Sequence, residues 1–224
     1  MTDFCIWRTQ MPIAVSILLG YLIGGINPAY LIAKYKGFDI RKRGSGNAGA
    51  SNAVITMGKK VGAISALLDI FKAYLAVVIA GLLFPEAPLA KAFMGASCIL
   101  GHIFPIYMKF RGGKGLASLG GVILAFHPLV FVILLAVELV IVLIVDYICI
   151  VPITASVAFP IIYISMTQDR VGAILYGLLA FVIFFKHIEN LKRIRSGTEA
   201  HFSFLWRRKK EIERLGGNPD DITQ

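Results

Sequence analysis

Charged residues are scarce in this sequence. Only 16% of its 224 residues are charged, while 57% are hydrophobic and the mean hydropathy is +0.76. Soluble domains average about 25% charged residues. A chain of this composition cannot cover itself with polar surface in water, so we expect lipid to be its main solvent.

Cysteines are few, and they are scattered. Cys5, Cys98 and Cys149 lie far apart in the sequence, which excludes a disulfide framework and a zinc-binding spacing. We expect them to be small buried residues, and we expect no metal site. The sequence also lacks a clear signal-peptide cleavage site after its first apolar run, so that run is interpreted as a retained first helix.

What the chain has instead is long apolar runs. A helix needs about 20 residues to cross the hydrocarbon core of a bilayer. The runs predict an all-α, polytopic membrane protein whose spans are 11–35, 61–84, 89–108, 116–126, 129–146, 149–166 and 171–186. The fourth run is too short to cross alone without tilting or being partly buried in protein.

The positions of the basic residues decide how that short run is counted. Segments 34–60, 109–114 and 186–214 contain 7, 3 and 9 of the 23 Lys and Arg residues. Such residues collect on the cytoplasmic side, and all three segments reach the same side only if 116–126 counts as a separate pass. The sequence therefore predicts seven transmembrane helices, with the N-terminus outside and the C-terminus in the cytoplasm. Residues 1–186 form the membrane domain, and 187–224 form a cytoplasmic segment.

The first polar segment on that side, RGSGNAGASN at 43–52, contains a G-x-G-x-x-G spacing. A dinucleotide site would need a preceding strand and a βαβ unit, but apolar spans flank this loop, so the nucleotide interpretation fails. Glycine-rich backbone can still direct N–H groups at an anion. We expect a phosphate or oxyanion cradle built from these residues: Ser45, Gly46, Asn47, Gly49, Ser51 and Asn52.

The second and third segments carry further candidates. In GHIFPIYMKFRGGKGLAS (101–118), Lys114 stands among Gly112, Gly113 and Gly115 and could neutralise a phosphate, while His102 begins the segment. In HIENLKRIRSGTEAH (187–201), a continuing helix would align one face at i, i+3 and i+6 spacing. The candidates on the third segment are His187, Asn190, Arg193 and Glu199.

Signals of covalent catalysis are missing. The sequence contains no G-x-S-x-G elbow and no H-x-x-x-x-D pattern, and no cysteine has a neighbouring histidine. It also lacks the internal repeat that many transporters have. In the second span, Asp69 and Lys72 stand at i, i+3 spacing and are expected to pair in support of helix packing.

Together the three segments resemble the bacterial integral-membrane glycerol-3-phosphate acyltransferases that use acyl phosphate as donor. The matching motifs are GSGNAGASN, GHIFPIYMKFRGGKGLAS and HIENLKRIRSGTE. The resemblance implies a multi-pass protein of the cell membrane with its active site facing the cytoplasm. It also implies acyl phosphate and glycerol 3-phosphate as substrates, lysophosphatidic acid as product, and no metal or soluble cofactor.

The hypothesis is direct attack of the glycerol C1 hydroxyl on the acyl phosphate, without an acyl-enzyme. His187, Asn190, Ser45 and Lys114 are the catalytic candidates, and the other residues named above bind substrate or phosphate. Expected partners are membrane lipid and, as a candidate, the enzyme that forms acyl phosphate; no nucleic acid is expected. One departure keeps alternatives open, because Ile55 stands where the family motif has arginine. The alternatives are a diverged paralogue, idle or with another substrate, and a transporter of phosphorylated metabolites.

Overall fold

The computed structural model describes residues 2–214, and this part of the chain is helical with no β-strand. The elements are α1 (Thr2–Gly25), α2 (Pro28–Tyr35), η1 (Ile40–Lys42), α3 (Ala50–Met57), α4 (Lys59–Leu83), α5 (Leu89–Ile103), η2 (Ile106–Met108), α6 (Leu116–Phe126), α7 (Pro128–Val145), α8 (Ile150–Thr167), α9 (Arg170–Arg195), η3 (Phe202–Leu205) and α10 (Arg208–Arg214). The all-α prediction is confirmed. The rejection of a dinucleotide-binding unit agrees with the absence of strands from the described residues.

Six helical segments among the described residues are long and apolar enough to cross a membrane. They are Gln10–Tyr35, Lys59–Leu83, Leu89–Met108, Pro128–Val145, Ile150–Thr167 and Arg170–Arg195. The chain is therefore a multi-pass membrane protein. The short α6 has 11 residues, as expected for 116–126, and its crossing and the orientation of the termini stay predictions.

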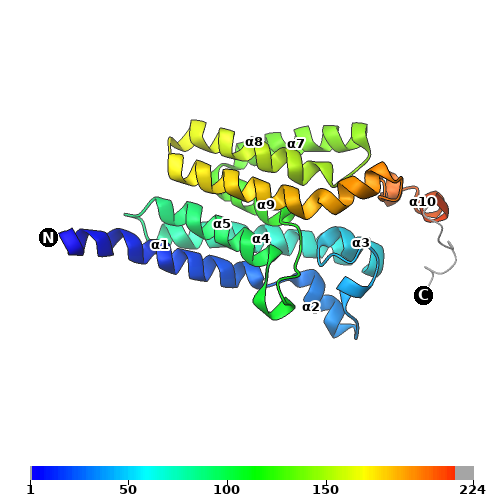
Figure 1. Ribbon diagram of the computed structural model, residues 1–224, viewed down its shortest axis with the longest axis horizontal. Helices are drawn as coiled ribbons and strands as arrows, with labels where there is room; N and C mark the ends of the chain where they lie inside the picture. Colours follow the sequence, from blue (N-terminus) through cyan, green and yellow to red (C-terminus); the bar gives the residue numbers. More distant parts are fainter. Residues whose placement is uncertain (1, 215–224) are drawn as a thin grey trace.

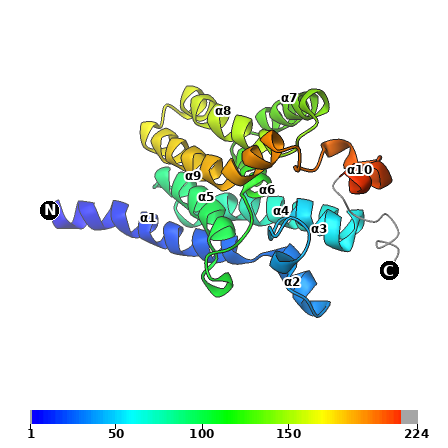
Figure 2. The same cartoon turned by 45° about the vertical axis from the view of Figure 1, so that its right-hand side comes forward.

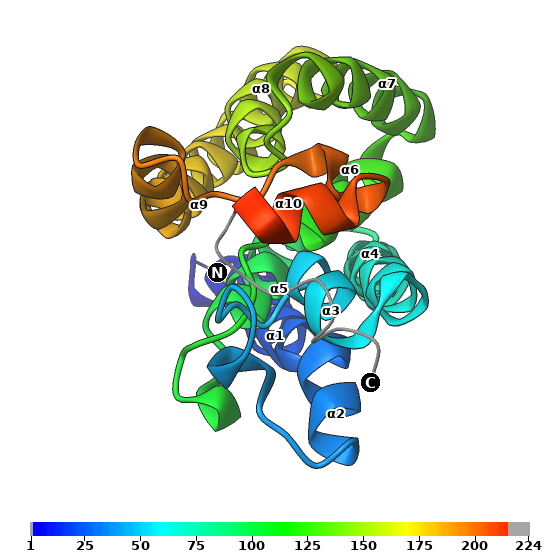
Figure 3. The same ribbon diagram turned by 90° about the vertical axis from the view of Figure 1, so that its right-hand side faces the viewer.

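Helix α5 lies at the centre of the bundle and α7 at its edge. In the most apolar window of each, 67% of the α5 segment is buried inside the protein but only 11% of the α7 segment. Seen from one end, α7, α8 and α9 form one group, α1, α4 and α5 form another, and α6 lies between them (Figure 3). Most of the surface of α7 is thus left for lipid.

The packing of α1 against α5 depends on small residues. A Cβ atom added at Gly20 would lie 2.4 Å from the carbonyl oxygen of Met94, and one at Gly24 would lie 1.9 Å from that of Cys98. Larger side chains would push the helices apart. Close approach of backbones through glycine is the usual way in which helices associate in lipid, where no hydrophobic effect drives them together.

The first membrane segment is broken between α1 and α2, and polar groups satisfy the break. Asn27 caps α2 by accepting a hydrogen bond from the Tyr30 N–H at 2.9 Å, and Pro28 occupies the first helical position. The buried ammonium group of Lys72 donates to the carbonyls of Gly24 at 2.9 Å and Ile26 at 2.5 Å. Carbonyls at a helix end need such partners because lipid offers none.

The same ammonium group joins α4 to α5. Lys72 Nζ lies 2.7 Å from Asp69 Oδ1, which confirms the pair expected from the sequence. His102 Nδ1 lies 3.2 Å from the same carboxylate oxygen and 3.1 Å from Lys72 Nζ. All three side chains are buried, so the second motif begins at a buried polar cluster. The sequence did not predict that His102 joins the Asp69–Lys72 pair.

Helix α9 continues unbroken to Arg195, beyond the predicted end of the last span at 186. Cys98 and Cys149 are free and buried, as expected, whereas the side chain of Cys5 lies outside the described residues. His127 caps α7 by accepting a hydrogen bond from the Val130 N–H at 3.3 Å.

We predict that Lys72→Met lowers the free energy of unfolding by about 3–5 kcal/mol, the usual effect of removing one partner from a buried ion pair. The substitution leaves a buried carboxylate and two helix-end carbonyls without their cation. Thermal unfolding in detergent measures the effect. Lys60→Met, an exposed change on the same helix, is the control, and equal melting temperatures for the two variants would contradict the prediction.

Candidate active site

Helix α3 and the end of α9 lie on the side of the bundle opposite the start of α1 (Figures 1 and 2), and contacts join parts of the three polar regions. Arg41, in the first basic region, donates from Nη1 to the carbonyl of Met108 in the second segment at 2.6 Å. Lys114 Nζ in the second segment donates to Asn190 Oδ1 in the third. The second and third segments therefore come together, as expected from the sequence. That the 43–52 loop joins them in one pocket stays a prediction.

The first loop is organised around the buried side chain of Asn52. Its Nδ2 group lies 2.8 to 3.0 Å from the carbonyls of Ile40, Arg43 and Asn47, and its Oδ1 accepts the Ser45 N–H at 2.9 Å. The Asn52 side chain therefore bonds backbone groups of the protein and fixes the shape of the loop. We assign it a positioning role rather than direct contact with a ligand.

Two glycines allow the chain to turn around Asn52. Gly44 and Gly46 have φ of +57° and +73°, a conformation that glycine adopts without strain. A Cβ atom at Gly44 would lie 2.3 Å from Asn52 Oδ1. The glycine spacing that imitates a nucleotide motif is therefore needed for a tight turn around an amide.

An anion could still bind where this loop enters α3. Gly49 is the N-cap residue and provides no side-chain cap, so the first N–H groups of the helix have no partner within it. A helix N-terminus with free N–H groups attracts anions. Ser45 and Ser51 are exposed beside it and Asn47 is half-buried, so their side chains remain available to a ligand.

Two glycines of the second loop use their N–H groups within the protein. The N–H of Gly112 donates to the Ile103 carbonyl and that of Gly113 to the His102 carbonyl, both at 3.0 Å. A Cβ atom at Gly113 would lie 2.0 Å from His102 Nε2. These two glycines let the loop pack on the His102 ring, and phosphate binding by Gly112, Gly113 and Gly115 stays a prediction.

The second and third segments form a continuous polar chain. Lys114 bonds Asn190 Oδ1, Asn190 Nδ2 donates to Glu199 Oε1 at 2.5 Å, and Arg193 Nε donates to Glu199 Oε2 at 2.6 Å. The two terminal nitrogens of Arg193 have no partner among the described residues. One ammonium and one guanidinium are thus held by a single chain of contacts and are near enough for their charges to interact.

Burial shifts the pKa values of two groups near this chain of hydrogen bonds. Burial, assisted by the positive charge of Arg193, lowers the pKa of Lys114 to about 8. Nearby Cys149 is affected in the opposite sense, since burial raises the pKa of its thiol to about 11. At neutral pH the site therefore contains a protonated lysine and an unreactive thiol.

His187 projects from the same helix as Asn190, one turn earlier, and is buried. Its Nδ1 lies 2.7 Å from the carbonyl oxygen of Ile183. A carbonyl can only accept, so Nδ1 carries a proton, and when the ring is neutral its lone pair is at Nε2. No hydrogen bond joins His187 or Lys114 to the 43–52 loop within the part of the chain that the structure describes.

Ser118 is a candidate that the sequence did not single out for the site. It lies in the first turn of α6, after Gly115, which begins that helix with φ +93°. Its hydroxyl is buried and has no hydrogen-bond partner among the described residues. An unpaired buried hydroxyl four residues from Lys114 is a donor ready for a ligand.

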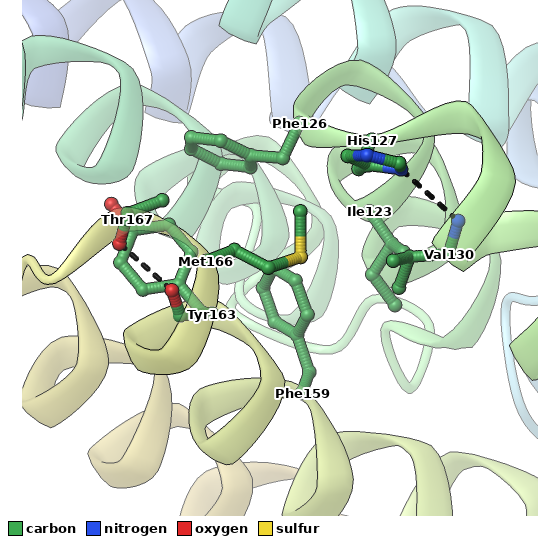
Figure 4. Close-up of a pocket in the computed structure, with 8 residues that line it drawn as sticks. All are labelled: Ile123, Phe126, His127, Val130, Phe159, Tyr163, Met166 and Thr167. Atoms are coloured by element: carbon green, nitrogen blue, oxygen red, sulfur yellow. Dashed lines mark hydrogen bonds between the residues drawn. The ribbon is translucent and has the colours of Figure 1, made fainter.

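A separate cavity of about 250 Å³ lies between α6, α7 and α8, at the end of the bundle away from these groups. Its wall is mainly apolar and aromatic, and the only ring nitrogens in it belong to His127, the cap of α7 (Figure 4). It offers no cation to an anionic ligand. The polar end is therefore the better candidate site.

Comparison with known proteins identifies the family to which this site belongs. A family model described as glycerol-3-phosphate acyltransferase matches residues 14–197. Curated glycerol-3-phosphate acyltransferases of Bacillus velezensis and Bacillus subtilis are 37% and 36% identical to this chain. The alignments cover 84% and 87% of this chain, and 97% and 100% of the relatives.

The chain belongs to the glycerol-3-phosphate acyltransferase family. Among solved structures it is similar to the glycerol 3-phosphate form of PlsY (YgiH), an integral membrane glycerol 3-phosphate acyltransferase. The TM-score is 0.79 at 32% identity, over 86% of this chain and 96% of the other. The lysophosphatidic acid form of the same protein matches with a TM-score of 0.74. The protein is thus an integral-membrane acyltransferase, as the motifs indicated.

Ile55, the departure from the family motif, is half-buried on α3 and lies near Gly44. Its side chain brings no charge to the loop. The cations that hydrogen bonds hold at or between the three polar regions include Arg41, Lys114 and Arg193. Position 55 itself therefore offers no cation to an anionic ligand in this chain.

We predict that Gly113→Ala disrupts the site, because the added methyl group would overlap the His102 ring, which cannot retreat from Asp69. Activity should fall by at least about tenfold, and the melting temperature should fall as for other overpacked cores. Gly177→Ala on α9 is the control, since no atom lies within 4 Å of its added Cβ. Wild-type activity and melting temperature in Gly113→Ala would contradict this account.

Proposed function

We propose that this acyltransferase moves an acyl group from acyl phosphate to the sn-1 hydroxyl of glycerol 3-phosphate, releasing lysophosphatidic acid and phosphate. The observation that carries the proposal is the polar chain from Lys114 through Asn190 and Glu199 to Arg193, which holds two cations beside the buried His187. The similar PlsY structures are a glycerol 3-phosphate form and a lysophosphatidic acid form, which is consistent with this acceptor and product.

Both substrates are anions, and the site provides two places for them. Lys114 and the free nitrogens of Arg193 bind the phosphate of glycerol 3-phosphate by charge-assisted hydrogen bonds. The N-terminus of α3, with the side chains of Ser45, Asn47 and Ser51, holds the second phosphate or the developing oxyanion. Asn52, Glu199 and the glycines Gly46, Gly49, Gly112, Gly113 and Gly115 position these groups.

The transfer needs no covalent intermediate, because acyl phosphate is already an activated mixed anhydride. The C1 hydroxyl oxygen attacks the acyl carbonyl, the ester C–O bond forms, and the bond from the carbonyl carbon to the phosphate oxygen breaks. His187 Nε2 accepts the hydroxyl proton, and phosphate leaves with the electron pair. Holding two reactants in line can contribute about 7–11 kcal/mol, and each oxyanion donor about 3–4 kcal/mol.

The side chains near the site favour this direct route over an acyl-enzyme. Cys149 stays a thiol at neutral pH because burial raises its pKa to about 11, and a thiol is a poor nucleophile. The serines of the first loop, Ser45 and Ser51, are exposed and have no base bonded to them among the described residues. The proposal therefore requires no metal, soluble cofactor or catalytic cysteine.

The proposal places the protein in the cell membrane with this end toward the cytoplasm, in the entry step of phospholipid synthesis. The basic residues of its three polar segments support that orientation. Membrane lipid surrounds the bundle, and an enzyme that forms acyl phosphate is the candidate partner, because the mixed anhydride is labile in water.

The purified protein in lipid, supplied with palmitoyl phosphate and labelled glycerol 3-phosphate, should form lysophosphatidic acid and free phosphate without ATP or coenzyme A. His187→Ala should reduce turnover by about 100-fold or more, as loss of a general base does. Product formed only from acyl coenzyme A would contradict the donor. Full turnover by His187→Ala would contradict the base, and uptake of the label into vesicles without acylation would indicate a transporter.

The KM for glycerol 3-phosphate should rise with pH above about 8. Burial lowers the pKa of Lys114 to about 8, so the binding cation is present below that pH and is lost above it. The limiting slope is about tenfold per pH unit. The phosphate itself titrates near pH 6 and adds nothing in this range.

Lys114→Arg is the matched control for this pH dependence, because a guanidinium keeps its proton throughout. Its KM should not change between pH 8 and 10, whatever its absolute activity. A wild-type KM that is constant over the same range would show that Lys114 does not bind the acceptor.

A further inference from the structure

The residues that follow the family match fold back over the candidate site. The match ends at residue 197, and the chain then continues through η3 into α10. In the end-on view of Figure 3, α10 crosses between the group of α7, α8 and α9 and the group of α1, α4 and α5. We call residues 201–214 the C-terminal strap.

Arg214, at the end of the strap, holds the turn that carries Glu199. It donates from Nη1 to the Gly197 carbonyl and from Nη2 to the Glu199 carbonyl, both at 2.5 Å. This turn closes α9, and Thr198 and Glu199 donate their N–H groups to the Arg193 carbonyl at 2.8 and 3.1 Å. A cation is favoured here because carbonyls at a helix C-terminus carry partial negative charge.

Glu211 fixes the guanidinium of Arg214 in place. The buried carboxylate lies 2.5 Å from Arg214 Nη2 and accepts the His201 N–H at 2.8 Å, while His201 Nδ1 lies 3.1 Å away. Burial alone would raise the pKa of Glu211, but the hydrogen bonds from Arg214 and His201 outweigh it and hold the pKa at about 2. The pair therefore stays ionised at every pH where the enzyme would be assayed.

The start of the strap is attached to the loop between α7 and α8. Asp146 accepts hydrogen bonds from the N–H of Ser203 at 2.7 Å and from its hydroxyl at 2.9 Å. The Asp146 carbonyl accepts the Phe202 N–H at 2.7 Å. The strap is thus held at both ends, at Asp146 and at the Glu199 turn.

We propose that the C-terminal strap holds Glu199 in register with Asn190 and Lys114, and that Arg214 is a positioning residue for acyl transfer. The inference rests on the proposed function for its catalytic readout. Arg214 bonds the Glu199 backbone, the Glu199 carboxylate bonds Asn190, and Asn190 bonds Lys114. In this proposal Arg214 acts through this chain of contacts and not by binding substrate.

Removing Arg214 should change the surroundings of Lys114 as well as the position of Asn190. The charged and titratable groups that influence Lys114 are Arg193, Glu199, Cys149 and Lys186, but burial has the largest effect on its pKa. A loosened turn admits water to the ammonium group, which favours its charged form. The pKa of Lys114 should therefore rise.

The test compares variants of the full chain in lipid nanodiscs. In Arg214→Ala, kcat should fall by about tenfold, the scale expected when charge-assisted hydrogen bonds are lost. The KM for glycerol 3-phosphate should begin to rise at a higher pH than in the wild type. Arg214→Lys should recover part of kcat, because an ammonium group can still bond one of the two carbonyls. Lys210→Ala, an exposed change on the same helix, should stay within about twofold of wild type.

Two results would overturn the proposal. One is an Arg214→Ala enzyme with wild-type kcat and an unchanged pH dependence. The other is a loss of activity that follows only the loss of folded protein, with the remaining folded fraction having wild-type kcat and pH dependence. Melting temperature and size-exclusion profiles measure that fraction.

A wild-type protein without turnover would contradict the proposed function, and the strap is then tested separately. Labelling of Lys114 by an amine-selective reagent, followed against pH by mass spectrometry, reports its pKa directly. A higher labelling pKa in Arg214→Ala than in wild type and Lys210→Ala supports the strap. Equal labelling curves for all three proteins overturn it.

Discussion

The buried ammonium group of Lys72 is the interaction on which the rest of the structure depends. It neutralises Asp69, contacts His102, and satisfies the carbonyls where α1 breaks before α2. In lipid these groups would otherwise be unpaired, each at a cost of several kcal/mol. Because His102 supports Gly113 and the break leads into the first polar loop, this one cation helps to place two of the three polar segments of the candidate site.

Polar groups at the active end divide into those that shape the loops and those left for substrate. Asn52 and the N–H groups of Gly112 and Gly113 are engaged by the protein itself. Three kinds of group have no partner within the described residues. They are the first N–H groups of α3, the hydroxyl of Ser118 and the terminal nitrogens of Arg193. The proposed site for two anions needs both kinds of polar group, because the loops must keep their conformation before a charged substrate binds.

Sequence patterns predicted much of this arrangement. Apolar runs located the helices, including the separate short α6, and polar segments located the end at which the site lies. They could not predict which N–H groups face inward, because a glycine needed for ligand contact and one needed for packing, such as Gly113, look alike in sequence. Nor could they predict the contacts of His102 with Asp69 or of Arg214 with Glu199, which join residues that lie well apart in the sequence. The apolar pattern ends at 186 because the final turns of α9 are polar, so its continuation to Arg195 was only an open alternative in the sequence.

A structure of the protein with bound glycerol 3-phosphate tests the central claim most directly. The account predicts a phosphate oxygen within about 3 Å of Lys114 Nζ, the length of a charge-assisted hydrogen bond, with the C1 hydroxyl directed toward His187 Nε2. A phosphate bound away from Lys114 and Arg193, with His187 on the far side of the bundle from it, would contradict the account.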